Sequence, residues 1–207
     1  MSVGILLGFL GCLSTVLSDT PAEVGVASLR AGDLVEFPNQ PRRIRDLIES
    51  ALALTERKLG YQFGSHSPSQ GGMDCSGTVY RVLQDLEIGA PRSSRAMFAW
   101  VEEAGNLHRC GPEVQSMDDR RFDSLEPGDL LFWSGTYDTG KGDDAISHVM
   151  IYLGTSRKDG KPVIFGASSG RRYRGLRIHG VSVFDFQIPA KGSRSVFVGY
   201  GAPPGLR

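Results

Sequence analysis

Little in this sequence indicates a disulfide framework, a metal site or a nucleic-acid surface. Among 207 residues there are three cysteines, Cys12, Cys75 and Cys110, and so small and odd a number makes no disulfide framework. Cys75 and Cys110 could still pair, because sequence alone does not show the geometry that a disulfide needs. The 23 basic residues balance 23 acidic ones, so a nucleic-acid partner, which usually requires a strongly basic face, is not expected. Zinc-type ligand spacing and a glycine-rich phosphate loop are both missing, and we expect no metal and no cofactor.

The N-terminal apolar run, residues 3–17, is shorter than the about 20 residues that a membrane-spanning helix needs. It fits the apolar region of a secretory signal, with Val16 and Ser18 as a small-residue cleavage pattern, although no Lys or Arg precedes it. Residues 9–12 loosely resemble a lipobox, which would make Cys12 a lipid anchor to a membrane. A plain buried helix is a third interpretation. We predict a signal segment over residues 1–18, and therefore export.

Residues 19–207 are predicted to form a single domain, since the chain has no internal repeat or long linker and domains typically run about 100–200 residues. Apolar spacing predicts helices over residues 42–59, 78–86 and 91–104, the first ended by Gly60. Strands are predicted after a turn at 31–37, and at 130–133, 147–153, 163–167, 181–186 and 196–200. Because helices come first and strands cluster afterwards, the fold class is α+β with an antiparallel sheet.

Cys75 lies where a loop becomes the N-terminus of a helix, which suits a nucleophile. The positive end of the helix dipole favours the thiolate, and the first backbone N–H groups can stabilise an oxyanion. The alternative is a buried structural cysteine. The polar neighbours Asp74 and Ser76 argue against a dry apolar site for it.

A catalytic base must come from elsewhere in the chain, and four histidines are present: His66, His108, His148 and His179. His66 and His108 lie in polar, irregular segments and are expected to be exposed. His148 opens the apolar strand 149–153, so its ring would project from a rigid element. A satisfied core histidine is the alternative interpretation of that position.

Five short motifs then occur in a recognisable order between residues 61 and 169. They are Tyr61-x-Phe63-Gly64, Asp74-Cys75-Ser76-Gly77, Pro91-Arg92-x-Ser94, residues 125–130 (LEPGDL) and residues 147–154 (SHVMIYLG). Each is weak alone, but together, in order and sensibly spaced, they resemble the NlpC family of papain-like cell-wall cysteine peptidases.

The resemblance implies a papain-like fold with N-terminal helices packed on a central antiparallel sheet. It also implies hydrolysis of an amide bond in peptidoglycan stem peptides, often between D-glutamyl and diaminopimelate or lysine, in the periplasm or cell envelope of a bacterium. Cys75 is the implied nucleophile and His148 the implied base. Tyr61 would contact the oxyanion or substrate, and Asp74 and Ser76 would hold a polar end such as a free amine. An aromatic lid for Tyr61 and a helix N-cap for Asp74 stay open as structural alternatives.

The sequence departs from the family pattern at the third catalytic position. The family has a polar residue there that orients the imidazole, and this chain has Gly166. Ser168 lies on the same face of an extended strand and is the preferred candidate. His179, a backbone carbonyl or a water are alternatives.

The basic segment 170–180 also departs from the family pattern. Its arginines, at positions 171, 172, 174 and 177, are expected to form a solvated loop rather than a polyanion site. The strand predicted after it could line the cleft. Two other functions stay open: a related thiol amidase or acyltransferase acting on another substrate, and a degenerate protein that binds wall peptides without cleaving them.

Overall fold

A computed structural model describes residues 1, 25–140, 142 and 145–207 of the chain. The predicted signal segment, apart from Met1, and the candidate lipid anchor Cys12 lie outside the described residues. Within the described ranges, no helix has both the length and the apolar character needed to cross a membrane.

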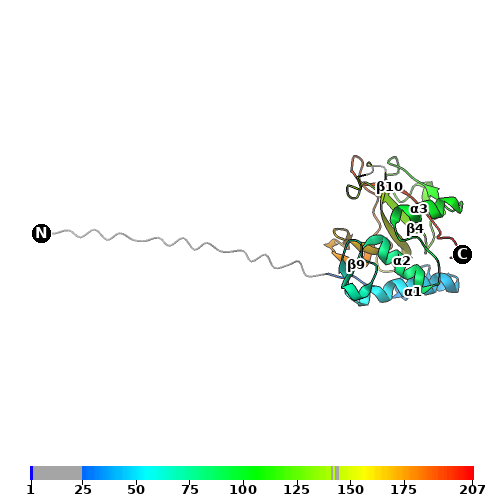
Figure 1. Ribbon diagram of the computed structural model, residues 1–207, viewed down its shortest axis with the longest axis horizontal. Coiled ribbons are helices and arrows are strands. Elements are labelled where there is room, and N and C mark those ends of the chain that lie inside the picture. Colours follow the sequence, from blue (N-terminus) through cyan, green and yellow to red (C-terminus); the bar gives the residue numbers. More distant parts are fainter. Residues whose placement is uncertain (2–24, 141, 143–144) are drawn as a thin grey trace.

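A six-stranded sheet forms the centre of the molecule, and every neighbouring pair of its strands is antiparallel (Figure 1). Its strand order is β3-β10-β4-β5-β6-β9. The strands are β3 (His108–Arg109), β4 (Leu130–Ser134), β5 (Ile146–Thr155), β6 (Pro162–Ser168), β9 (Gly180–Asp185) and β10 (Val196–Gly201). The central strands β4 and β5 are buried almost throughout, because both of their faces are covered. The predicted α+β class with an antiparallel sheet is confirmed.

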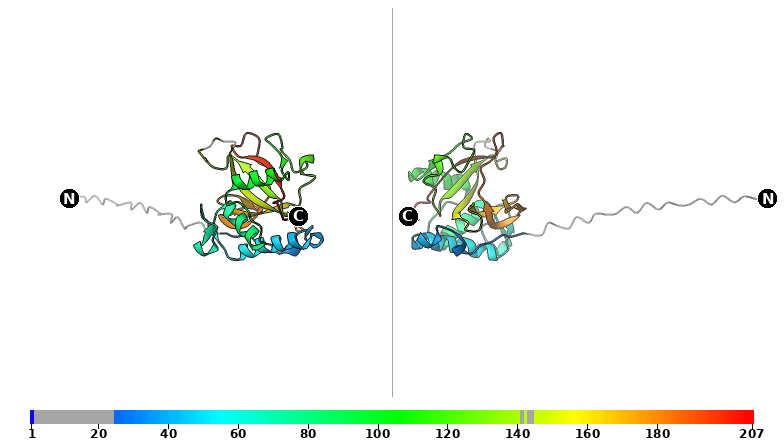
Figure 2. Two further views of the ribbon diagram at one scale, coloured as in Figure 1. Left: turned by 45° about the vertical axis from the view of Figure 1, so that its right-hand side comes forward. Right: turned by 180° about the vertical axis from the view of Figure 1, so that it is seen from behind.

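Three α-helices pack on this sheet: α1 (Arg42–Glu56), α2 (Cys75–Asp85) and α3 (Ser94–Glu103). α1 packs against β6 and β9, α2 against β5 and β6, and α3 against β5. The two views of Figure 2 show α1 and α2 side by side below the strands. The N-terminus of α2 is thereby directed at the middle of the sheet, where β5 begins.

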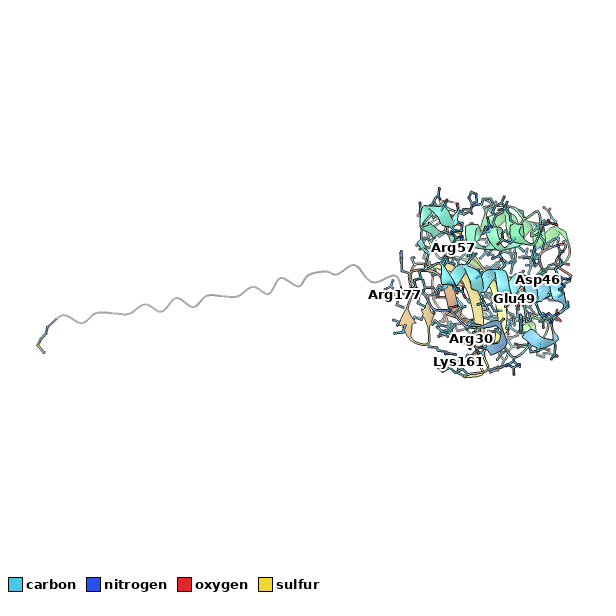
Figure 3. All side chains as sticks on the ribbon, turned by 90° about the horizontal axis from the view of Figure 1, so that it is seen from below. Arg30, Asp46, Glu49, Arg57, Lys161 and Arg177 are labelled. Carbon is cyan, nitrogen blue, oxygen red and sulfur yellow. The ribbon has the colours of Figure 1, made fainter. Side chains whose placement is uncertain are left out.

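The helix α1 is amphipathic. Its buried face carries Ile44, Leu47, Ile48, Ala51, Leu52 and Leu54, at the spacing that one face of an α-helix requires. Asp46, Glu49 and Arg57 point outward from the same segment (Figure 3). The predicted end of this helix was wrong. The helix stops at Glu56, because Lys58 takes the left-handed conformation (φ 51°), and Gly60 instead begins β1.

The strand predicted after the turn at 31–37 is also wrong. Leu34 forms one isolated antiparallel bridge with Ser156, between the 3₁₀ turns Ala31–Asp33 and Phe37–Asn39. Pro38 lies in the second turn and has no N–H to donate to a ladder, so the strand cannot continue.

Two short two-stranded pairs flank the main sheet. β1 (Gly60–Tyr61) and β2 (Gly72–Met73) pair in parallel just before α2, and β7 (Arg172–Tyr173) and β8 (Leu176–Arg177) form a hairpin within the basic segment 170–180. The first pair fixes the loop that precedes Cys75. The second returns the chain from β6 toward β9.

Close packing between this loop and the first turn of α2 requires glycine at position 77. A Cβ atom there would lie 2.1 Å from the carbonyl oxygen of Ser65 and 2.9 Å from Cα of His66, both backbone atoms. That backbone is held in place, because the N–H of Asp74 donates to the same Ser65 oxygen at 3.0 Å. The nucleophile motif therefore requires Gly77, because only glycine lets the loop at Ser65 and His66 pack this closely against the first turn of α2.

Replacing Gly77 by Ala is expected to lower the free energy of unfolding by about 1–3 kcal/mol, the usual cost of overpacking. This loss should outweigh the gain of about 1 kcal/mol that Ala brings in a helix interior. Urea denaturation measures it, with Gly89→Ala as the control, since a Cβ there meets no atom within 4 Å. Equal stability of the two variants would contradict the packing argument.

Candidate active site

Cys75 is the first residue of α2, and Asp74 is its N-cap. The Oδ1 atom of Asp74 accepts a hydrogen bond from the N–H of Gly77 at 2.6 Å, so one of the free donors of the first turn is satisfied. The sulfur is buried beside β5, where the backbone N–H of Val149 stabilises its thiolate. Val149 directly follows His148, so the backbone next to the predicted base lies beside the predicted nucleophile.

Burial dominates the acidity of the thiol. It raises the pKa of Cys75 to about 11, although the N–H groups of Val149, Ser76 and Cys75 itself act in the opposite direction. The sequence-based expectation that the helix N-terminus favours the thiolate therefore has the right sign, but desolvation is the larger effect. Without substrate, Cys75 is a neutral thiol at neutral pH.

His148 lies on the face of the sheet that is turned away from α3. Phe132 packs edge-on against Phe98 of α3, so its neighbour Trp133 points to the opposite face. Trp133 is the cross-strand partner of His148, and their ring centroids lie 5.7 Å apart. Burial, and then the guanidinium of Arg171, lower the pKa of His148 well below its usual 6.5. The imidazole is therefore neutral at neutral pH and able to accept a proton.

Ser168, the preferred candidate for the orienting residue, does not contact the imidazole of His148. Its Oγ accepts the N–H groups of Gly170 and Arg171, at 3.4 and 3.3 Å, and so holds the turn after β6. Among the described residues, the buried Nε2 of His148 has no hydrogen-bond partner. His179, the other candidate, is exposed and packs against the ring of Tyr61.

Met150 occupies the space where the family has its orienting side chain. A Cβ atom at Gly166 would lie 3.1 Å from Cγ and 3.2 Å from Cε of Met150. The thioether thus packs over the glycine.

Arg171 is a component of the site that the sequence did not reveal. Its guanidinium lies 4.1 Å above the ring of Trp133, and its charge acts on both His148 and the Cys75 thiolate. The expectation of a solvated loop is therefore wrong for Arg171, which is half-buried. The same expectation is confirmed for Arg172, Arg174 and Arg177, which are exposed. In the sequence, Arg171 could be noticed only because it follows the end of β6 by three residues. The strand register that places it over Trp133 is not encoded by neighbouring residues.

Asp74 and Ser76 form a polar network with Arg92 of the Pro-Arg motif. Arg92 donates to both carboxylate oxygens of Asp74, at 3.1 and 2.9 Å, and to Ser76 Oγ at 2.9 Å. The N–H of Gly64 donates to the second carboxylate oxygen at 2.8 Å. The N-cap alternative for Asp74 is thus confirmed, and the same carboxylate also ties the preceding loop to α2.

Three aromatic side chains, Tyr61, Phe63 and Tyr137, line the cleft above Cys75. Burial, followed by the charges of the Cys75 thiolate and Asp74, raises the pKa of Tyr61, so its hydroxyl keeps its proton and can donate. Phe63 is 72% exposed and meets Tyr137 edge-on with ring centroids 5.9 Å apart. These two rings are covered by little else and can contact a ligand.

Two cavities share this aromatic wall. One of about 280 Å³ is lined by Cys75, Asp74, Ser76 and Arg92, and the other, of about 990 Å³, is lined by His148, Ser168 and Arg171. The nucleophile borders the first and the base borders the second. An extended ligand can therefore lie across the catalytic pair, with one half in each cavity.

The described part of the chain offers no alternative chemistry at this site. Cys75 and Cys110 are both free thiols, so the possible disulfide between them is not formed. No group of three or more His, Cys, Asp or Glu side chains in the described ranges is arranged to hold a metal ion. His66 and His108 are exposed and pack on Tyr80 and Tyr200, respectively.

Comparison with known proteins agrees with this geometry. The NlpC/P60 family model matches residues 58–172, more than half of the chain. The gamma-DL-glutamyl hydrolase of Bacillus subtilis (strain 168) is 37% identical over 105 residues, which cover 49% of this chain but 20% of that relative.

A solved structure shows a similar fold at lower identity. A lipoprotein-like NLP/P60 family protein from Staphylococcus aureus subsp. aureus Mu50 has a TM-score of 0.52 at 19% identity, over 79% of this chain and 42% of that one. An NlpC/P60 family protein from Bacillus cereus ATCC 10987 has a TM-score of 0.44 at 23% identity, over 77% and 40% of the two chains. The chain belongs to the NlpC/P60 family of papain-like cysteine peptidases.

Proposed function

We propose that this protein is an exported cysteine endopeptidase that hydrolyses an amide bond in peptidoglycan stem peptides, between D-glutamyl and the diamino acid that follows it. The observation that carries the proposal is the position of Cys75, at the N-terminus of α2 and on a cavity that shares its aromatic wall with the cavity lined by the neutral His148. Family membership supports the reaction class. The name of the Bacillus subtilis relative supports a glutamyl residue on the acyl side.

The chemistry begins from two neutral groups. As the Cys75 sulfur attacks the carbonyl carbon, its proton passes to His148, so the buried thiolate never has to exist alone. Backbone N–H groups at the start of α2 and the hydroxyl of Tyr61 are suitably placed donors for the oxyanion. The imidazolium then protonates the leaving amine as the C–N bond breaks. Water next attacks the thioester, gives its proton to His148, and releases the acid and the thiol.

The first cavity suits the acyl half of such a substrate. Asp74, Ser76 and Arg92 present oxygen and guanidinium groups around a space that borders the nucleophile. The Oγ of Ser76 and the outer carboxylate edge of Asp74 are the groups proposed to hold a free amine at the end of the peptide. Because Arg92 already neutralises Asp74, we expect Ser76 to contribute more to this contact than the motif alone suggests.

A non-catalytic wall-peptide binding protein is the second candidate. The observation that favours it is the orphaned Nε2 of His148 next to Gly166, where the family has an orienting side chain. A related thiol amidase or acyltransferase that acts on another substrate is the third. Cleavage of peptidoglycan, binding without cleavage, and the absence of both distinguish these functions.

The direct test is digestion of purified peptidoglycan by the protein lacking residues 1–18, with the products read by mass spectrometry. Cys75→Ala should abolish the stem-peptide products, and His148→Ala should reduce them by roughly 10²-fold or more, since each removes a group that takes part in the chemistry. Cys110→Ala, at the other described free thiol, is the matched control and should leave cleavage unchanged. Binding of stem peptides without cleavage by the folded native protein would favour the second candidate.

The pH dependence of kcat/KM follows from the lowered pKa of His148. A neutral imidazole is the active form, so the acidic limb should lie well below pH 6.5. Arg171→Gln removes one of the two causes of that shift, and should move the limb to higher pH. Initial rates measured between about pH 4 and pH 8 give the profile. An acidic limb at or above pH 6.5 in the native protein would refute the neutral resting imidazole.

The absent orienting residue can be restored. Gly166→His alone should be destabilising by about 1–3 kcal/mol, because the new side chain meets Met150. Gly166→His combined with Met150→Ala relieves that contact, and should raise kcat by roughly 10-fold, since a partner for Nε2 fixes the imidazole. Met150→Ala alone is the matched control. A double variant no faster than this control would show that the missing partner does not limit turnover.

A further inference from the structure

The cavity on the His148 side has basic side chains in its lining. Its lining includes two arginines, Arg171 and Arg194, with hydroxyl groups from serines at positions 168, 169, 193 and 195, and no described lining residue is an aspartate or glutamate. A volume of about 990 Å³ is large enough for several peptide groups. Its chemistry suits a ligand that carries negative charge.

Arg171 is held with its guanidinium at the edge of this cavity. The turn after β6 fixes its backbone through Ser168 Oγ, and the N–H of Ile178 donates to its carbonyl oxygen at 2.9 Å. Its guanidinium lies over the Trp133 ring, which limits its freedom. Among the described residues, no carboxylate lies within ion-pair distance of Arg171, so its donors are available to a ligand.

The charge of Arg171 persists in the working enzyme. Burial lowers the pKa of the guanidinium to about 10, while the Cys75 thiolate raises it, and the group stays protonated at neutral pH. A planar guanidinium with fixed geometry binds a carboxylate through two parallel hydrogen bonds. The exposed Arg172, Arg174 and Arg177 do not line this cavity, and Arg177 lies at the outer edge of the molecule (Figure 3).

The catalytic pair defines which half of the substrate reaches this cavity. The acyl group stays on the sulfur of Cys75, which lines the smaller cavity, whereas the leaving amine takes its proton from His148. His148 lines the larger cavity, and Cys75 does not. The leaving-group half of the substrate must therefore lie beside Arg171.

We propose that Arg171 is a specificity-determining residue that binds a free carboxylate on the leaving-group half of the substrate. The inference rests on the proposed function, and it names the diamino acid that the enzyme prefers. Diaminopimelate carries a carboxylate at the far end of its side chain, and lysine carries none. The site therefore favours stem peptides with diaminopimelate whose side-chain carboxylate is free.

The test uses two synthetic peptides of the form L-Ala-γ-D-Glu-X with the C-terminus amidated. In one, X is meso-diaminopimelate, and in the other its side-chain carboxylate is replaced by a carboxamide, which keeps the size and removes one charge. The native protein should cleave the first with a kcat/KM about 10- to 100-fold higher, the range expected for a charge-assisted contact. Measured at a pH above the acidic limb of both proteins, Arg171→Gln should lose that preference, because it slows cleavage of the first peptide much more than cleavage of the second.

Two further variants separate recognition from folding. Arg171→Lys keeps the charge without the two-pronged geometry, and should retain part of the preference. Arg172→Gln removes an exposed charge of the same hairpin, outside the cavity, and should keep all of it. Thermal unfolding of each variant identifies a loss of structure. If Arg171→Gln is unfolded, the Arg171→Lys variant and the two-peptide comparison on the native protein test the proposal.

The outcomes distinguish this inference from the proposed function. Equal cleavage of both peptides by the native protein would overturn the role of Arg171 and leave the endopeptidase in place. The same would follow if Arg171→Gln slowed both peptides equally, since the charge would then act on the reacting atoms. Cleavage of neither peptide by the native protein would count against the proposed function itself.

Discussion

Five donor groups converge on the carboxylate of Asp74, and the geometry of the whole site follows from them. Through it, the N–H of Gly64 in the preceding loop, the first turn of α2 and the guanidinium of Arg92 are joined at one point. The contact places the Cys75 sulfur near the start of β5, beside the N–H of Val149. A buried charge of this kind is stable because each of its oxygens is paired, and removing a partner would leave an uncompensated charge.

The same burial determines how the catalytic pair rests. Desolvation raises the pKa of Cys75 and lowers that of His148, so both groups are neutral until the substrate arrives. In the proposed reaction the charged state appears during the attack, and N–H groups and the hydroxyl of Tyr61 are its proposed donors. A site of this type works through donors that are in place before the reaction, and its thiol is protected from other chemistry in between.

The face of the sheet that carries His148 differs from the family pattern in two linked ways. The orienting side chain is replaced by Gly166 with Met150 packed over it, and a cation, Arg171, enters over Trp133 from the turn after β6. The loss of a hydrogen bond to Nε2 and the gain of a nearby charge both disfavour the imidazolium. This arrangement lowers the basicity of the His148 imidazole. It also places the fixed positive charge of Arg171 at the cavity that His148 lines.

The local sequence by itself determined the helices and strands, because apolar spacing and glycine or proline boundaries reflect short-range geometry. It also pointed to Cys75 and His148 as the candidate nucleophile and base, and it offered the N-cap role of Asp74 as one of two alternatives, since each residue lies in a motif of chain neighbours. Where it failed, at the end of α1 and at residues 34–37, a left-handed Lys58 and a proline turn decided the outcome. Four features follow from tertiary packing alone. They are the burial that shifts the pKa values of Cys75 and His148, the hydrogen bonds of Ser168 within the turn after β6, the contact of Met150 with Gly166, and the position of Arg171. These depend on strand register and on packing between residues far apart in the chain, and no local pattern encodes either.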